Sequence, residues 1–101
     1  MNTHYRNQLL ALLCDITDPD EMSAALDIIL TDKEHEDVDK RLQIFHLLED
    51  NIPQREVSKA LGVGIATVTR GSKAMQTDSY RKLDTQLAQC RAPQNFKANH
   101  D

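Results

Sequence analysis

Glycine is scarce in this chain of 101 residues, and its placement is uneven. The only three glycines lie within ten consecutive residues, GVGIATVTRG at positions 62–71. The run between them, Ile65 to Thr69, is rich in β-branched residues and has the composition of a strand. The rest of the chain is patterned as helix, so this segment is the first place to look for a specialised turn.

Aromatic residues and long apolar runs are also scarce. The chain has two Tyr, two Phe and no Trp, so its core must be built mainly from Leu, Ile, Val, Ala and Met. No apolar run approaches the ~20 residues needed to span a bilayer. The N-terminus has no basic region followed by an apolar stretch, which is the pattern of a secretory signal. We therefore expect a cytoplasmic protein without a membrane segment.

Cysteine and histidine occur without the spacing of metal or redox sites. Cys14 and Cys90 form no CxxC pair, and we expect both to be free thiols in a reducing cytosol. The four histidines are scattered, at positions 4, 35, 46 and 100. Neither residue type shows a metal-ligand spacing, so the sequence predicts no metal site and no cofactor.

The net charge of −4 argues at first against a nucleic-acid partner, but the charge is unevenly spread. Residues 15–50 contain twelve acidic and three basic residues. Residues 53–82 contain six basic and two acidic residues, a local balance of +4. A polyanion responds to the local field more than to the total charge, so the second half of the chain is a candidate surface for DNA.

The apolar residues repeat at helical spacing along almost the whole chain, which predicts an all-α fold. Asp18-Pro19 and Thr31-x-x-Glu34 are helix-start signals. In the third helix the predicted core face is Val38, Leu42, Phe45 and Leu48, broadened by Ile44 and Leu47. Helices are expected at about residues 4–16, 18–30, 31–49, 54–61, 65–75 and 77–90.

The predicted domain is one helical unit, residues 1–90, followed by a mobile segment, residues 91–101, with Pro93 and no periodicity. Each helix is too short to be stable alone. The first three helices have large apolar faces that a chain of this size cannot cover by itself. A second copy of the chain is the expected cover, so we predict a homodimer.

Three interpretations of GVGIATVTRG compete. A phosphate-binding loop fails on spacing, because no glycine stands at position 67, no G-K-[ST] follows and no strand precedes the segment. A strand would have no partner to pair with. A helix-turn-helix accounts for more of the residues: Gly62 is the ninth residue counted from Gln54, Val63 is the apolar residue of the turn, and Val68 lies on the inner face of the second helix.

The helix-turn-helix interpretation also predicts which side chains meet DNA. Thr67, Thr69, Arg70 and Lys73 remain on the outer face of the second helix. Gly64 and Ala66 keep the start of that helix slim, so that its backbone N–H groups can approach phosphates. Arg55 and Lys59 can reach phosphate or guanine. A generic helical hairpin without a DNA function is the alternative.

The segments Gln54-Arg55-Glu56 and Leu61-Gly62-Val63-Gly64-Ile65-Ala66-Thr67-Val68-Thr69-Arg70-Gly71-Ser72 closely resemble the bacterial Trp repressor family. This family is one of the known users of the helix-turn-helix. The likeness extends more weakly over residues 25–90, through Leu30-Thr31 and Arg41-Leu42-Gln43-Ile44. The resemblance implies an intertwined homodimer that binds double-stranded operator DNA when L-tryptophan occupies a pocket beside the helix-turn-helix of each subunit.

The resemblance also implies site residues. The residues expected to face DNA are Gln54, Arg55, Lys59, Gly64, Ile65, Ala66, Thr67 and Thr69, to which the outward position of Lys73 adds a ninth. Arg41 and Arg70 are expected to sandwich the indole of the ligand, with Gly71 along the ring and Ala74 nearby. Ile28, Leu30 and Thr31 are expected to come from the second subunit. Arg41 pairing with Asp37, and Arg70 contacting only phosphate, are the structural alternatives.

The sequence departs from the family pattern at three points. Ala74 stands where tryptophan-binding members usually carry Ser, which removes a hydroxyl near the polar end of the ligand. The interval from Arg41 to Gln54 is one residue shorter, which corresponds to about 100° of helix. Pro53 replaces a Ser, which removes a capping box with Glu56 although Pro itself can start a helix.

The predicted function is therefore a sequence-specific transcriptional repressor, controlled by a small-molecule corepressor such as L-tryptophan. One alternative is a regulator of the same fold with a different effector or none. Another is a helical protein-interaction module, in which the hairpin docks a protein. An enzyme is not supported, because no nucleophile–base pair, carboxylate pair or metal cluster stands out.

Overall fold

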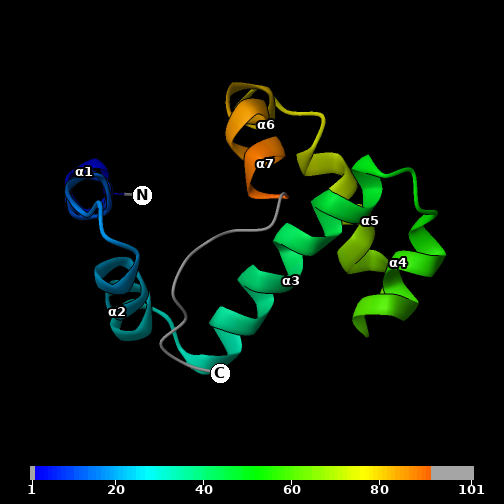
Figure 1. Ribbon diagram of the computed structural model, residues 1–101, viewed down its shortest axis with the longest axis horizontal. Helices are drawn as coiled ribbons and strands as arrows, with labels where there is room; N and C mark the ends of the chain where they lie inside the picture. The colour runs from blue at the N-terminus through cyan, green and yellow to red at the C-terminus, as the bar shows by residue number, and fades with distance from the viewer. Residues whose placement is uncertain (1, 92–101) are drawn as a thin grey trace. The chain divides into compact units, whose positions relative to one another are not determined.

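A computed structural model describes residues 2–91, and over that range the chain is helical with no strand (Figure 1). The predicted all-α class is confirmed. The helices are α1 (Thr3–Asp15), α2 (Pro19–Ile29), α3 (Asp32–Glu49), α4 (Gln54–Leu61), α5 (Ile65–Ala74), α6 (Asp78–Lys82) and α7 (Asp84–Cys90). No helix among the residues described has the length and apolarity to cross a membrane.

The chain divides into two compact units, the first ending at His35 and the second beginning at Glu36. In the first unit the predicted helix-start signals are confirmed. The Asp18 carboxylate accepts a hydrogen bond from the Glu21 N–H at 3.0 Å, with Pro19 at the first helical position. Thr31 and Glu34 form a reciprocal capping box, with N···O distances of 2.9 and 3.1 Å.

The first unit buries very little apolar surface within the single chain. In α1 no residue is buried, and in α2 only Ala25 is. Tyr5 is 68% exposed and Ile28 is 84% exposed, and Leu10, Leu12 and Ile29 are exposed as well. Burial of such side chains provides most of the free energy of folding, so these helices need a further surface to pack against.

The second unit has a small core between α3, α4 and α5. Ile44, Val57 and Val68 are completely buried. They are surrounded by half-buried side chains of these helices and their turns: Leu47, Leu48, Ile52, Leu61 and Val63. The predicted core face of the third helix is partly wrong, because Val38 is 53% exposed and Ile44 is the central residue. The residues that α3 contributes to this core, Ile44, Leu47 and Leu48, all lie in its C-terminal half, and Val38 is not among them.

Gly71 lies where α5 packs against Ile44 of α3. A Cβ added to Gly71 would lie 2.7 Å from Cγ2 of Ile44, closer than real Cβ atoms come to any heavy atom. Gly71 is buried, and its backbone geometry is that of an ordinary helix. It is therefore required for packing and not for backbone conformation, and Ile44 occupies the space that a side chain would need.

The predicted last helix is wrong in one respect, because it is two helices. Leu83 ends α6 with φ −109° and ψ 14°, and its N–H bonds to the Tyr80 carbonyl at 3.1 Å. This tight turn breaks the continuous apolar stripe that the spacing of Tyr80, Leu83, Leu87 and Cys90 predicted. Leu83 is 52% exposed, whereas Tyr80 and Cys90 are anchored separately on α3.

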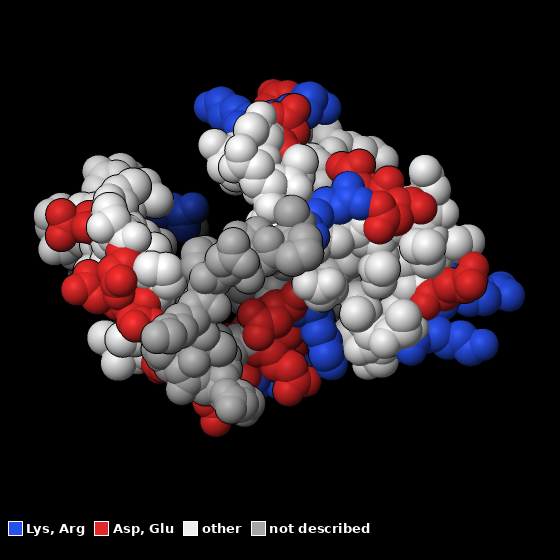
Figure 2. All heavy atoms as spheres, viewed as in Figure 1, with Lys and Arg blue, Asp and Glu red and all other residues white. Residues whose placement is uncertain are grey.

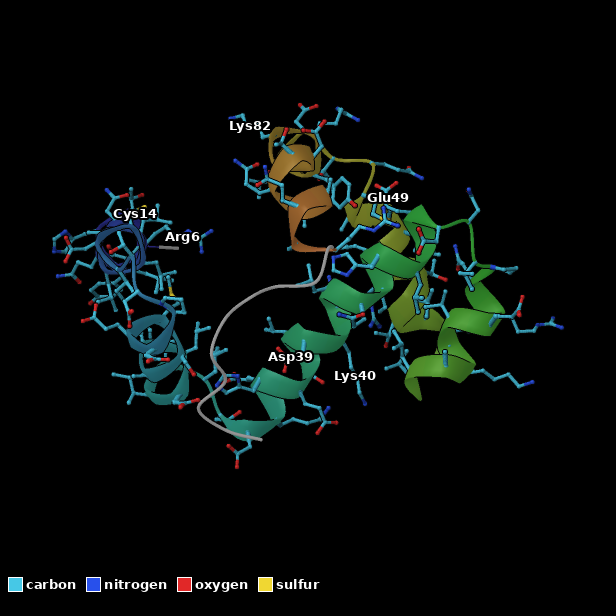
Figure 3. The ribbon with its side chains drawn as sticks, in the orientation of Figure 1. Arg6, Cys14, Asp39, Lys40, Glu49 and Lys82 are labelled. Carbon is cyan, nitrogen blue, oxygen red and sulfur yellow. The ribbon has the colours of Figure 1, made fainter. Side chains whose placement is uncertain are left out.

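Two polar contacts and one aromatic contact hold α6 and α7 to the end of α3. The Tyr80 ring meets Phe45 edge-on, with centroids 5.2 Å apart, and its hydroxyl donates to Glu49 at 2.9 Å. Glu49 is labelled at the end of α3 in Figure 3. Burial and the Glu49 carboxylate raise the pKa of Tyr80 to about 12. His46 Nε2 lies 3.2 Å from Cys90 Sγ, so α7 is anchored on the same stretch of α3.

Arg91 forms an ion pair with Asp50. The sequence analysis assigned Arg91 to the mobile terminal segment, but its side chain lies against the turn after α3. The remainder of that segment, residues 92–101, lies outside the part of the chain that the structure describes.

Acidification is expected to destabilise the fold through His46. Burial, and secondly the positive charge of Arg91, lower the pKa of His46 from 6.5. The unfolded chain therefore takes up a proton at a higher pH than the folded chain, so stability falls as the pH drops from about 7 to about 5. His46→Gln should show a smaller loss of melting temperature over this range, whereas His4→Gln, at an exposed position, should match the wild type. An unchanged pH profile in His46→Gln would contradict the assignment.

Asn51 closes the turn after α3 in a left-handed conformation, with φ 63°. Asn tolerates this region better than other side chains, and glycine better still. Asn51→Ala is expected to lower the free energy of unfolding by about 1 kcal/mol, and Asn51→Gly to leave it nearly unchanged. Urea unfolding of the two variants checks this pair, and equal effects would show that backbone conformation is not the reason for Asn51.

Candidate nucleic-acid interface

The helices α4 and α5 are joined by a three-residue turn, Gly62 to Gly64. Gly62 ends α4 in the left-handed conformation, with φ 66° and ψ 37°, as the sequence predicted. No atom lies within 4 Å of a Cβ added there, so conformation and not space requires the glycine. Val63 is half-buried against the core of Ile44, Val57 and Val68. The turn is thus fixed from inside and short enough to hold α5 at one angle to α4.

Ser58 fixes the turn from the side of α4 and was missed by the sequence analysis. Its hydroxyl donates to the Val63 carbonyl at 2.5 Å, and its own carbonyl accepts from the Val63 N–H at 3.2 Å. A serine in the last two turns of a helix, four residues before the glycine that ends it, is the sequence signal that could have found it.

The N-terminal ends of both helices are open. Neither Pro53, before α4, nor Gly64, before α5, provides a side-chain cap. Gly64 has open space where a Cβ would stand, and α5 has no acidic residue in its first turn. The next two residues, Ile65 and Ala66, are exposed. At α5, free backbone N–H groups and the positive end of the helix dipole therefore face outward, which favours an anionic partner. At α4 the carboxylate of Glu56, in the first turn, offsets part of this effect.

Basic side chains surround these two helix ends. Arg55 and Lys59 project from α4 and Lys73 from α5, and all three are exposed. In the space-filling view, basic side chains project beyond α4 with an acidic side chain beside them, and acidic side chains gather over α2 and α3 (Figure 2). The local excess of positive charge that the sequence predicted is therefore presented by the α4–turn–α5 segment.

The remaining predicted DNA-facing residues are half-buried: Gln54, Thr67 and Thr69. Two of them contact each other, since Thr69 Oγ1 lies 3.0 Å from Gln54 Oε1. Thr69 Oγ1 also lies 3.0 Å from the Ile65 carbonyl oxygen. The structure thus brings together the first residue of α4 and the fifth residue of α5, both of which were predicted to face DNA.

The predicted ligand-binding residues lie on both units. Ile28, Leu30 and Thr31 belong to the first unit, and the side chain of Ile28 is 84% exposed. The other four belong to the second unit: Arg41, Arg70, Gly71 and Ala74. Both arginines are exposed, Ala74 is half-buried and Gly71 is buried against Ile44. Among the described residues, no His, Cys, Asp and Glu side chains gather in threes to hold a metal.

The comparisons with known proteins agree on one family. The family model described as "Trp repressor protein" matches residues 5–89. A "Trp operon repressor homolog" of Xylella fastidiosa is 39% identical over 74 residues, which cover 72% of this chain and 80% of the relative. A "Trp operon repressor homolog" of Vibrio campbellii is 36% identical over 86 residues, covering 81% and 86%. No solved structure gives a significant match.

The match covers both units and includes the whole α4–turn–α5 segment. The relatives carry the name of a repressor and not of an enzyme. The chain therefore belongs to the Trp repressor family and is a repressor-type regulator.

Proposed function

We propose that the chain is a DNA-binding transcriptional repressor that reads double-stranded operator DNA with α5, supported by α4 as a helix-turn-helix. The observation that carries this proposal is the open, slim and basic N-terminal end of the α4–turn–α5 segment. In this motif the N-terminal residues of the second helix meet the base edges, and the first helix crosses the phosphate backbone. Ile65, Ala66 and Thr67, at the start of α5, would meet the base edges. On α4, Lys59 would contact phosphate, and Arg55, in the first turn, would reach a guanine edge.

The repressor acts as a homodimer in this proposal. The support is the exposed apolar surface of α1 and α2, carried by Tyr5, Leu10, Leu12, Ile28 and Ile29. Exposed apolar patches of this kind mark protein interfaces. The α5 helices of the two subunits, about 34 Å apart, would then enter successive major grooves of a palindromic operator.

The proposed effector is L-tryptophan, or a small molecule of similar shape. Its site would lie beside the α4–turn–α5 segment. Arg41 and Arg70 would contact the two faces of the ligand ring, Gly71 would lie along the ring, and Ala74 would lie nearby. Ile28, Leu30 and Thr31 of a second copy would complete it. Ala74 provides no hydroxyl, and a missing hydrogen bond of this kind costs about 1 kcal/mol, so we expect weaker binding of tryptophan than serine would give. Binding of the effector would shift the dimer toward conformations in which its two α4–turn–α5 segments are spaced to bind DNA.

A gel-shift titration tests the function and the effector separately. The probe is a duplex from the control region of the gene that encodes the chain, with random duplex as competitor, with and without L-tryptophan. We expect the chain to retard the specific probe, and L-tryptophan to raise its affinity for that probe. Equal affinity with and without tryptophan would contradict tryptophan as the effector and leave the DNA-binding function supported. No retention at low salt would favour a protein-interaction module, whereas binding that weakens steeply as salt rises would indicate phosphate contacts.

A further inference from the structure

The hydrogen bond between Thr69 and Gln54 joins residues that are 15 positions apart in the sequence. It connects the first residue of α4 to the middle of α5, on the outer side of the core formed by Ile44, Val57 and Val68. Both side chains are half-buried. We infer that Thr69 is a positioning residue: it holds the Gln54 carboxamide in one orientation for DNA, and it does not read DNA itself. This inference rests on the proposed function.

The single hydroxyl proton of Thr69 can be donated to only one acceptor at a time. The Thr69 hydroxyl has one proton and two acceptors at 3.0 Å, the Gln54 side-chain oxygen and the Ile65 carbonyl. The Ile65 carbonyl already accepts the N–H of Thr69 in the regular helical pattern. Donation to Gln54 therefore leaves no group without a partner.

This arrangement fixes the free end of Gln54. With its oxygen bound to Thr69, the amide presents its NH₂ group, which has two donors, away from α5. Donors suit phosphate oxygens and the acceptors on the edge of guanine. The NH₂ group belongs to the first turn of α4, where Pro53 provides no cap and backbone N–H groups are also free. The same turn carries the Glu56 carboxylate, which disfavours an anion, so Thr69 adds a directed donor where the helix end alone offers little attraction.

Fixing Gln54 before DNA arrives strengthens binding. A free glutamine side chain loses rotamer freedom when it binds, and a preorganised one has already lost it. Because Thr69 acts through Gln54, removing both should cost no more than removing Gln54 alone. If instead both residues contact DNA directly, as the sequence analysis expected, their effects should add.

A double-mutant cycle on DNA binding tests the inference. The probe is the duplex that the wild-type chain enriches most from a randomised pool, in the presence of L-tryptophan. Thr69→Val removes the hydroxyl at nearly constant shape and should weaken binding about fivefold, equivalent to about 1 kcal/mol. Thr69→Ser keeps the hydroxyl and should remain within about twofold of the wild type. In the Gln54→Ala background, Thr69→Val should change affinity by less than about twofold.

The controls separate positioning from folding and from the proposed function. Thr85→Val, at an exposed position of α7, should leave affinity unchanged. Circular dichroism at the titration temperature checks that each variant is folded, so that a loss of affinity is not a loss of structure. Additive effects of Gln54→Ala and Thr69→Val, or no effect of Thr69→Val, would overturn the inference alone. Failure of the wild-type chain to enrich any sequence would overturn the proposed function and this inference with it.

Discussion

Gly71→Ala is expected to lower the free energy of unfolding by about 1–3 kcal/mol, the cost of adding a methyl group to a filled core. The added Cβ would lie 2.7 Å from Cγ2 of Ile44, which is itself completely buried. Neither atom can move easily, because Cγ2 is branched directly from the Ile44 Cβ and α5 is held by the turn at Gly62. Urea unfolding at a fixed protein concentration measures the loss.

A second change tests whether the contact with Ile44 is the cause. Ile44→Leu removes Cγ2 at nearly constant volume and should cost less than about 1.5 kcal/mol by itself. In combination, Gly71→Ala and Ile44→Leu should destabilise less than the sum of the two single changes. Additivity would show that Ile44 is not the obstacle.

The other two glycines provide matched controls. Gly64→Ala enters open space at an ordinary φ of −69° and should leave stability unchanged or raise it slightly. Gly62→Ala also enters open space, but at φ 66°, and should cost about 1–2 kcal/mol through backbone strain. Three Gly→Ala variants within ten residues are therefore expected to give three different results. Equal losses at all three positions would contradict both the contact with Ile44 at Gly71 and the need for a positive φ at Gly62.

Much of the fold could be predicted from the sequence because its signals are local. The caps at Asp18 and Thr31 involve residues three apart, and the left-handed end of α4 needs only a glycine after an amphipathic helix. Such features depend on backbone geometry that neighbouring residues determine. These features therefore form without help from tertiary packing.

The errors concern choices that packing makes. The period of a helix identifies an apolar stripe, but α3 has apolar residues on a broad arc, and the stripe does not indicate which of them meets α4 and α5. Ile44 is completely buried with Val57 of α4 and Val68 of α5, whereas Val38, six residues earlier on α3, is 53% exposed. The break at Leu83 is similar, since Tyr80 is held by Phe45 and Glu49, which lie far away in the sequence.

The candidate site shows the same division. The turn, its glycines and the exposed basic residues could be predicted, because they follow from one short segment. The contact between Gln54 and Thr69, and the packing of Gly71 on Ile44, could not, because each joins residues on different helices. Both findings change how a predicted site residue is understood without removing it from the proposed interface.

Arg55→Ala is expected to weaken binding to the selected duplex by about 5-fold to 150-fold, which corresponds to the loss of a bidentate contact with guanine, about 1–3 kcal/mol. Arg55 is the second residue of α4, exposed beside the open helix ends, and an arginine there can reach a base edge. Binding to random duplex should fall much less. A titration of the two duplexes by fluorescence anisotropy gives both affinities.

Lys59→Ala is the matched control for Arg55→Ala, because it removes a positive charge of α4 without removing a contact to a base. Lys59 is exposed near the end of α4 and should contact phosphate alone, so its loss should weaken selected and random duplexes alike and reduce the salt slope by about 1. Lys82, labelled on α6 in Figure 3, lies outside the α4–turn–α5 segment, and Lys82→Ala should change neither quantity. If Arg55→Ala instead lowered both affinities equally, Arg55 would be a phosphate contact, and sequence reading would have to come from the first turn of α5.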